Sequence, residues 1–150
     1  MRLLAIDLGD KRTGLALGDR ITGVATPAGL IEIPIDQDRG RALLDALAAF
    51  IENEAGTLEA ILIGLPLNMD GTEGPRAKIV RAFGARLADR LGRDVTYHDE
   101  RRSSMAADDA MARTGLTHKQ KKLRRDALAA AAILQSYLDG SGLDPDDEPS

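Results

Sequence analysis

Close to its start the chain reads Arg2-Leu3-Leu4-Ala5-Ile6-Asp7-Leu8-Gly9-Asp10-Lys11-Arg12-Thr13-Gly14-Leu15-Ala16-Leu17-Gly18-Asp19. Two apolar runs on either side of the tight turn Gly9-Asp10-Lys11 predict a β-hairpin with strands at residues 2–8 and about 12–18. Glycine in the turn suits a backbone with positive φ. Asp7 ends the first run, where a buried carboxylate is costly unless it is paired or holds a cation. Asp7 is therefore the first candidate functional residue.

The pattern beyond the hairpin alternates strands and helices. We expect a third strand at about 24–33, an amphipathic helix at 38–54, a buried parallel strand at 60–64, a helix at 75–91, a short strand at 94–98, a helix from Ser103 or Ser104 through Arg113, and a last helix at about 123–138. Residues 117–122 begin either a basic loop or the next helix. This order predicts an α/β fold with a mixed five-stranded sheet, its first three strands antiparallel, and helices on both faces.

Composition limits the chemistry of the chain. With 150 residues, 43% hydrophobic and 29% charged, it is long enough for one globular domain with its own core. There is no cysteine, which excludes disulfides, thiolate nucleophiles and thiolate metal sites. Of two histidines, His98 is expected to pack at a strand end. A metal site would therefore consist mainly of carboxylates, which favour Mg²⁺ or Mn²⁺ over zinc.

Charge is unevenly distributed along the chain. The net charge is −4, but residues 139–150 hold five acids and no base, so the other residues contain 20 bases and 19 acids. We expect residues 1–138 to form the folded domain and residues 139–150 to form an acidic, disordered tail. Residues 101–125 hold eight bases and two acids. This local excess suits either a phosphate backbone or a solvated basic loop.

Two kinds of partner are disfavoured by composition. Aromatic residues make up 3% of the chain, too few for single-strand binding by base stacking. No apolar run approaches the ~18 residues of a membrane-spanning helix, and the first residues lack a signal-length apolar stretch. We therefore expect a cytoplasmic protein with no membrane partner.

Three acids are singled out by their positions. Asp7 ends the first strand, Glu100 follows the fifth, and Asp126 lies in the first turns of an Ala-rich helix. Asp126 shares a helix face with Ala130 and Ile133, which directs it toward the core. If the first and fifth strands end beneath that helix, three carboxylates converge, and their repulsion requires a cation or a raised pKa. Divalent ions in such a cluster would promote attack of water on a phosphodiester.

Each acid also has a purely structural interpretation. Asp7 in an Asx-turn, or Asp126 at a helix N-terminus, would serve the fold alone. Glu100 would do so in an ion pair with Arg101 or Arg12. The residues themselves leave these alternatives open.

Four stretches of the chain are similar to one known family. They are Asp7-Leu8-Gly9-Asp10-Lys11-Arg12-Thr13-Gly14, Gly64-Leu65-Pro66-Leu67-Asn68-Met69-Asp70-Gly71-Thr72-Glu73, Asp99-Glu100-Arg101, and Asp126 with Ala130, Ile133, Leu134 and Tyr137. Together they resemble the YqgF family, also called RuvX, over about residues 2–138. The resemblance implies an RNase H-like fold and a metal-dependent nuclease, described either as a Holliday junction resolvase or as a nuclease of pre-16S rRNA processing.

The resemblance places the three acidic active-site positions of the family on Asp7, Glu100 and Asp126, with Mg²⁺ or Mn²⁺ as cofactor. Arg102 stands where similar sequences often carry an apolar residue, and Ser103-Ser104 stands where Ser-Thr or Thr-Thr is frequent. Neither departure touches the acids. The implied reaction is phosphodiester hydrolysis at the 5′ end of pre-16S rRNA during ribosome biogenesis, with the small-subunit precursor as a partner.

Candidate phosphate contacts lie around the acids. Lys11 and Arg12 either neutralise phosphate near the metal or form ion pairs with Asp10 or Asp19. Asn68 either orients a phosphate or water, or is a turn side chain that bonds its own backbone. Basic residues beside the second and third acids complete the expected nucleic-acid contacts: Arg101, Lys121, Lys122, Arg124 and Arg125.

Competing functions remain open at this point. Backbone-directed positive charge suits RNA and DNA alike, so a branched-DNA nuclease and a non-catalytic rRNA-binding module stand beside the expected pre-rRNA nuclease. The first motif also resembles the phosphate loop of actin-like ATPases. Those proteins normally enclose the nucleotide between two such domains, and this chain has the length of one. The sequence does not indicate an oligomeric state.

Overall fold

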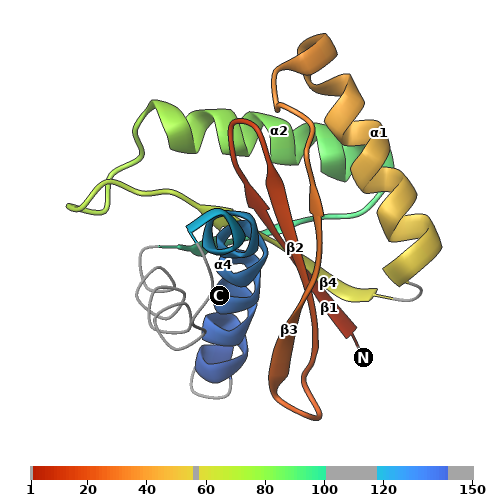
Figure 1. Cartoon of the computed structure of the whole chain (residues 1–150), viewed down its shortest axis with the longest axis vertical. Helices are drawn as coiled ribbons and strands as arrows, with labels where there is room; N and C mark the ends of the chain where they lie inside the picture. Colours follow the sequence, from red (N-terminus) through yellow and green to blue (C-terminus); the bar gives the residue numbers. More distant parts are fainter. Residues whose placement is uncertain (1, 56–57, 101–117, 142–150) are drawn as a thin grey trace.

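The computed structural model describes residues 2–55, 58–100 and 118–141; at residues 54–55, 118–126 and 141 it describes the backbone alone. The elements follow in the order β1 (Arg2–Leu8), β2 (Thr13–Asp19), β3 (Val24–Ile31), the 3₁₀ turn η1 (Gln37–Gly40), α1 (Arg41–Phe50), the π-helical turn η2 (Ile51–Ala55), β4 (Leu58–Leu65), α2 (Pro75–Leu91), β5 (Thr96–Asp99) and α4 (His118–Ser141) (Figure 1).

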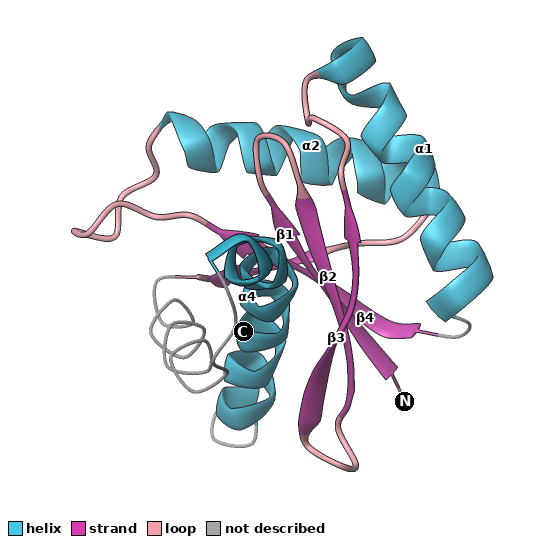
Figure 2. Ribbon diagram, viewed as in Figure 1, coloured by secondary structure: helices cyan, strands magenta, loops and turns pink. Residues whose placement is uncertain are grey.

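The five strands form one mixed sheet in the order β3-β2-β1-β4-β5. β1, β2 and β3 pair antiparallel, as the hairpin motif predicts, whereas β1, β4 and β5 run parallel. The parallel pairs are connected through α1 and α2, and Figure 2 shows these helices on one side of the sheet with α4 on the other. The predicted fold class is confirmed.

Strand alternation in β1 divides the core into two clusters. Leu4 and Ile6 face α1 and α2 in the larger cluster, whereas Leu3 and Ala5 face α4 in the smaller one. Asp7 has the same alternation as Leu3 and Ala5, so β1 carries it on the α4 face of the sheet.

Two glycines of the sheet allow α4 to approach closely. A Cβ atom at Gly18 of β2 would lie 2.9 Å from Cδ2 of Leu134, and one at Gly64 of β4 would lie 2.5 Å from Cδ1 of Ile133. Both helix residues are almost completely buried. None of the helices in the described part of the chain combines the length and the apolar character needed to cross a membrane.

The helix expected at 38–54 is interrupted at its start and altered at its end. Asp38, Arg39 and Gly40 have left-handed backbone angles, with φ of 52°, 57° and 87°, so α1 begins only at Arg41. Arg86 of α2 contacts this break, since its guanidinium donates to the Arg39 carbonyl at 2.6 Å. After Phe50 the chain continues as a π-helical turn. The regular helix is therefore shorter at both ends than its periodicity predicts.

Glycine serves the hairpin turn for a different reason from the one expected. The positive φ predicted there is absent from Gly9. Instead, its N–H donates to the Arg12 carbonyl at 2.9 Å, and the same carbonyl lies where a Cβ of residue 9 would stand. Gly9 is needed for a close backbone approach.

The last helix is longer than the sequence indicates. It starts at His118, so residues 118–122 continue the helix rather than forming a basic loop, and it ends at Ser141. The first three residues of the expected tail are therefore helical, and Asp139 accepts a hydrogen bond from Gln135. The remainder of that tail, and the helix expected up to Arg113, lie outside the described residues.

Candidate active site

Two of the three predicted acids lie at one edge of the sheet. Asp7 is the penultimate residue of β1, and Glu100 directly follows β5. Because β1, β4 and β5 are parallel, their carboxyl ends reach the same edge. The Glu100 N–H donates to the Leu65 carbonyl of β4 at 3.2 Å, which extends the β4–β5 pairing by one residue.

The Asp7 and Glu100 carboxyl groups are in direct hydrogen-bond contact. Burial raises the pKa of Glu100; the bond with Asp7 and the positive charge of Arg76 oppose part of that rise, and the charge of Asp99 adds to it. Two carboxyl groups in such contact share a proton or bind a cation, since two bare negative charges would repel each other. The first and fifth strands thus bring together the two acids that end them.

Gly64, which the sequence analysis did not assign to the site, lies against the Glu100 carboxylate of this pair. A Cβ at Gly64 would lie 2.9 Å from Oε2 of Glu100 as well as 2.5 Å from Ile133. The bare backbone of β4 therefore accommodates the Glu100 carboxylate and α4 together. Its place in a strand at a loop boundary is the sequence signal for such a close approach.

The third predicted acid, Asp126, lies on α4 one turn before the fully buried Ala130. The predicted helix phase is confirmed downstream, where Ala130 and Ile133 are buried and Tyr137 packs beside them. The side chain of Asp126 is outside the described residues. Among the side chains that the structure does describe, no group of three acids or histidines gathers as a metal site. The role of Asp126 stays a prediction.

The donor chemistry of the carboxyl pair fits the metal that the sequence predicts. Asp7 and Glu100 supply carboxylate oxygens, which suit a hard cation such as Mg²⁺ or Mn²⁺. His98 of β5 is engaged in packing, as expected: its Nε2 lies 3.0 Å from Oγ of Ser136, and its ring meets Tyr137 edge to face at 5.9 Å. The described residues therefore offer the cation two oxygen ligands.

Arg76 is a charged neighbour of the pair that sequence reasoning missed. It occupies the first turn of α2, donates from Nη2 to the Leu8 carbonyl at 2.8 Å and forms an ion pair with Asp10. A positive side chain at a helix N-terminus opposes the helix dipole. That unfavourable position was the available signal that Arg76 has a partner elsewhere.

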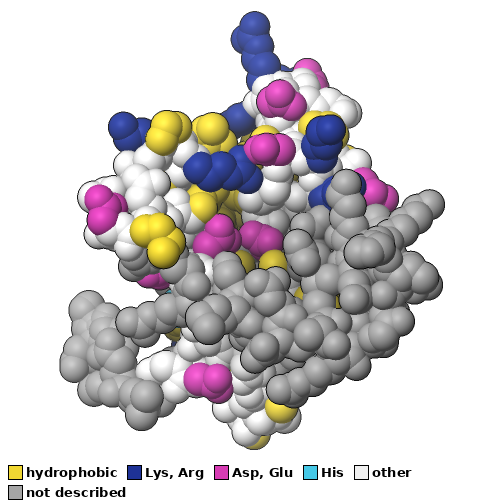
Figure 3. Space-filling view, turned by 60° about the vertical axis from the view of Figure 1, so that its left-hand side comes forward, with side chains coloured by type: hydrophobic (Ala, Val, Ile, Leu, Met, Phe, Trp, Pro, Cys, Tyr) yellow, Lys and Arg dark blue, Asp and Glu magenta, His cyan; other side chains and the backbone are white. Residues whose placement is uncertain are grey.

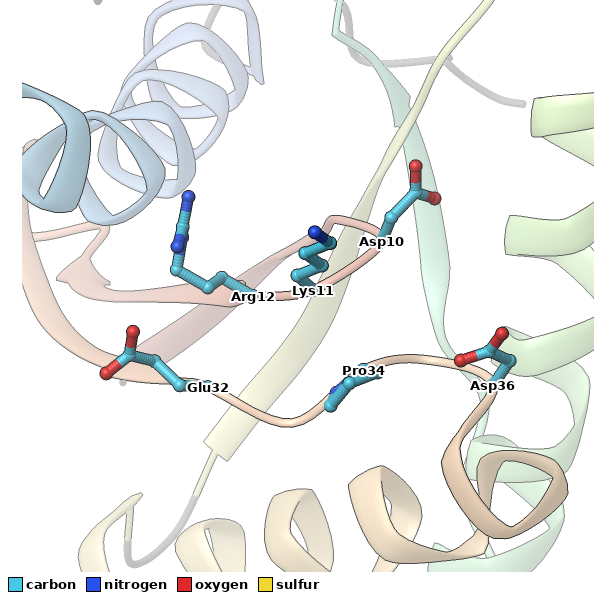
Figure 4. A pocket seen from close by; sticks show the side chains of 6 residues that line it. All are labelled: Asp10, Lys11, Arg12, Glu32, Pro34 and Asp36. Atoms are coloured by element: carbon cyan, nitrogen blue, oxygen red, sulfur yellow. The ribbon is translucent and has the colours of Figure 1, made fainter.

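Lys11 and Arg12 lie in the β1–β2 turn, at the rim of an open cleft of about 530 Å³. Figure 4 shows them on one side of the cleft, with Glu32, Pro34 and Asp36 of the segment after β3 on the other. The ion pair suggested for Lys11 with Asp10 is replaced by the pair between Asp10 and Arg76. The cleft adjoins the turn that follows Asp7.

Asn68 organises the loop between β4 and α2. Its backbone N–H donates to the Thr72 carbonyl at 2.8 Å, and its amide Nδ2 donates to Oγ1 of Thr72 at 3.0 Å. These bonds hold Asn68 within its turn, but the amide bonds the Thr72 side chain, whereas the structural alternative was a bond from the side chain to the backbone. Contact with phosphate is not tested by them and stays a prediction.

The remaining expected nucleic-acid contacts are only partly within the described structure. Arg101 lies outside it, whereas the backbone of the N-terminal half of α4 carries Lys121, Lys122, Arg124 and Arg125. In Figure 3, turned so that the left-hand side of Figure 1 comes forward, acidic side chains lie together below Lys and Arg side chains. Acidic and basic groups thus adjoin on this side of the molecule.

Comparison with known sequences gives one consistent result. A family model described as "RuvX: Holliday junction resolvase" matches residues 1–140. A protein of Ruegeria pomeroyi named "Putative pre-16S rRNA nuclease" is 42% identical over 91% of this chain and 85% of its own length. A protein of Geobacillus kaustophilus with the same name is 42% identical over 93% of this chain and 98% of its own length.

Comparison with solved structures agrees on the fold. Thermus thermophilus RuvC, solved with a Holliday junction substrate, matches with a TM-score of 0.56 at 16% identity over 93% of this chain and 95% of its own. The fowlpox virus resolvase with its junction DNA matches with a TM-score of 0.55 at 12% identity, over 93% and 98% of the two chains. At these identities the likeness establishes the architecture, which is RNase H-like.

Proposed function

Because the chain belongs to the RuvX family, described as Holliday junction resolvases, we propose that it is a divalent-metal-dependent nuclease that hydrolyses phosphodiester bonds of pre-16S rRNA. The observation that carries the proposal is the contact between the Asp7 and Glu100 carboxyl groups at the carboxyl edge of the sheet. A fold that needed these acids only for architecture would have no reason to bring two half-buried carboxyl groups together.

Asp7, Glu100 and Asp126 are the residues that we propose hold the cation. A bound Mg²⁺ or Mn²⁺ supplies Lewis-acid chemistry at the phosphodiester. Binding would require both carboxyl groups of Asp7 and Glu100 in their ionised form, so any proton held between them would be released. Asp126 would supply the third carboxylate from α4, because this helix lies over the face of the sheet that carries Asp7.

We propose that the basic residues bind the phosphate backbone. Lys11 and Arg12 follow Asp7 directly, and Arg101 follows Glu100 in the same way. Lys121, Lys122, Arg124 and Arg125 precede Asp126 on α4. Each acid thus has cations within a few residues, so a bound backbone would pass close to the proposed metal site.

Two substrates are supported to different degrees. Two relatives that are 42% identical over 85% and 98% of their own length carry the name "Putative pre-16S rRNA nuclease", which favours an rRNA precursor of the small ribosomal subunit. The family description names the Holliday junction instead, and branched DNA is therefore the second candidate. A protein that acts on a ribosomal precursor works in the cytoplasm, which is the location we propose.

The test compares cleavage of a pre-16S rRNA 5′ fragment and a four-way DNA junction by the purified chain in Mg²⁺ or Mn²⁺. We expect metal-dependent cleavage of the RNA, and a loss of about 100-fold or more in kcat for Asp7→Asn and Glu100→Gln, the scale on which removal of a group that stabilises the transition state acts. Asp126→Asn should behave alike.

Asp45→Asn is the matched control, because Asp45 is an exposed acid of α1 paired with Arg90 at 2.7 Å, remote from the carboxyl pair. It should cleave like the wild type. Junction cleavage without RNA cleavage would favour the DNA substrate. RNA binding with no cleavage of either substrate, unchanged in Asp7→Asn, would contradict the nuclease and favour a binding module.

A further inference from the structure

One guanidinium ties two points of the segment after Asp7 to a helix. Arg76 donates from Nη2 to the carbonyl of Leu8, the residue next to Asp7, at 2.8 Å, and its Nη1 pairs with the carboxylate of Asp10 in the β1–β2 turn. Asp10 in turn accepts the Ile35 N–H at 3.0 Å on its backbone carbonyl. The contacts of Arg76 therefore converge on the end of β1.

The bond to Leu8 lies where pairing of β1 with β4 has stopped. The parallel β1–β4 register ends at Ile6, so Leu8 lies beyond the last β4 partner, although β2 still pairs with it through Thr13. Asp7 is thus paired with β2 alone, just before a tight turn. Arg76 supplies a connection from α2 on that side, and its bond to Leu8 is partly buried.

Arg76 has more than one partner to offset its position at the N-terminus of α2. A cation there opposes the helix dipole by up to about 1 kcal/mol, about as much as its exposed pair with Asp10 contributes. The Arg76 side chain is 34% exposed, and its positive charge also lowers the pKa of Glu100. One residue of α2 therefore interacts with both segments that carry the acids.

We propose that Arg76 is a positioning residue, which fixes the end of β1 through Leu8 and Asp10 and so holds the Asp7 carboxylate against that of Glu100. The effect of Arg76 on catalysis rests on the proposed nuclease function. The structural link from Arg76 to β1 does not rest on that function, because it concerns only the conformation of the turn. A planar fork suits two acceptors in fixed directions, which a lysine ammonium does not reproduce.

Arg81 provides a matched control on the same helix. It also uses two nitrogens, Nε and Nη2, each 2.7 Å from a carboxylate oxygen of Glu73, and its side chain is 46% exposed. These bonds link α2 to the preceding loop and reach neither β1 nor its turn, although the guanidinium also lies 4.9 Å from the centroid of the Tyr97 ring in β5. Arg81→Lys and Arg81→Met therefore report the loss of a forked ion pair on α2 together with the loss of this contact to β5.

The first experiment follows amide hydrogen exchange in the full chain and needs no nuclease activity. The probes are the N–H groups of Gly9 and Ile35, which bond the Arg12 and Asp10 carbonyls at the turn. We expect both to exchange at least about threefold faster in Arg76→Lys and Arg76→Met. If the exchange rates of Gly9 and Ile35 did not change, or rose equally in the Arg81 variants, the proposal that Arg76 fixes this turn would be overturned.

The second experiment separates positioning from charge by steady-state cleavage of the pre-rRNA fragment in Mn²⁺. Arg76→Lys keeps the charge, so a positioning role predicts a kcat about tenfold lower with KM within twofold of wild type. The Arg81 variants should keep their kcat. If Arg76→Lys kept the wild-type kcat, or changed KM alone, the positioning role would be overturned. If the wild type itself cleaved nothing, the proposed nuclease function would be refuted. The hydrogen-exchange result would then decide by itself whether Arg76 fixes the turn after β1.

Discussion

The two faces of the sheet are built from the same strands but by different packing. On the face covered by α1 and α2, large aliphatic side chains such as Ile61 and Ile63 of β4 fill the space between sheet and helices. On the face covered by α4, Leu3 and Leu62 are also buried, but small residues such as Ala5 and Ala16, together with Gly64, let the helix lie close. Small residues and a glycine in the sheet thus distinguish the α4 face.

The difference assigns stability and chemistry to opposite faces. The α1/α2 face buries the larger hydrophobic cluster, and β1 contributes Leu4, Ile6 and Leu8 to it. The same strand turns Leu3, Ala5 and Asp7 toward α4, where the apolar series ends in a carboxylate. Close approach of α4 leaves little room above the sheet, so a carboxyl group there is partly desolvated, which agrees with the raised pKa of Glu100.

The largest effect on stability is expected on the α1/α2 face. Ile61→Ala removes a fully buried side chain from that cluster and should lower the free energy of unfolding by about 3 kcal/mol, through lost burial and the cavity left behind. The turnover of molecules that remain folded should persist. Urea unfolding measures the stability, and kcat corrected for the folded fraction measures the turnover. A lower corrected kcat in Ile61→Ala would show that the α1/α2 face also affects catalysis.

A smaller loss of stability with a larger loss of activity is expected three residues further along β4. In Gly64→Ala the new Cβ meets Ile133 at 2.5 Å and Glu100 at 2.9 Å, so α4 or the carboxylate must move. Overpacking of this kind costs about 2 kcal/mol. If the nuclease assignment is correct, kcat should fall at least about tenfold because Glu100 is displaced.

Gly18→Ala sharpens the same comparison on β2. Its Cβ would meet Leu134 at 2.9 Å and the Val24 carbonyl at 3.0 Å, so it crowds α4 without touching Glu100. A loss of stability similar to that of Gly64→Ala is expected, with kcat retained. Equal losses of kcat in the two variants would mean that the position of α4, rather than that of Glu100, controls turnover.

Periodicity predicted what depends on local sequence. The hairpin that carries Asp7, the apolar strand at β4 and the helix from Pro75 to Leu91 all follow from residue spacing and turn residues. The meeting of Asp7 with Glu100 was expected only if the first and fifth strands end together, and the parallel pairing of β1, β4 and β5 meets that condition.

Tertiary contacts account for what the sequence did not predict. Arg86 bonds the left-handed turn that precedes α1, which helical spacing cannot indicate, and Arg76 bonds Leu8 of β1, 68 residues earlier in the chain. Gly9 and Gly64 were visible as glycines, but the atoms they make room for come from elsewhere in the fold. The partners of a long side chain or a bare backbone depend on the assembled structure.

The smallest effect is expected at the outer rim of the α1/α2 face. Arg90 of α2 bonds Asp45 of α1 at 2.7 Å, and both side chains are about half exposed. Arg90→Met should change the free energy of unfolding by about 0.5 kcal/mol or less, because solvent and salt screen an exposed pair. Chemical denaturation at low and high salt measures this, with the difference expected to shrink as salt rises. A loss approaching that of Ile61→Ala would show that this face depends on its rim of ion pairs as well as on its aliphatic core.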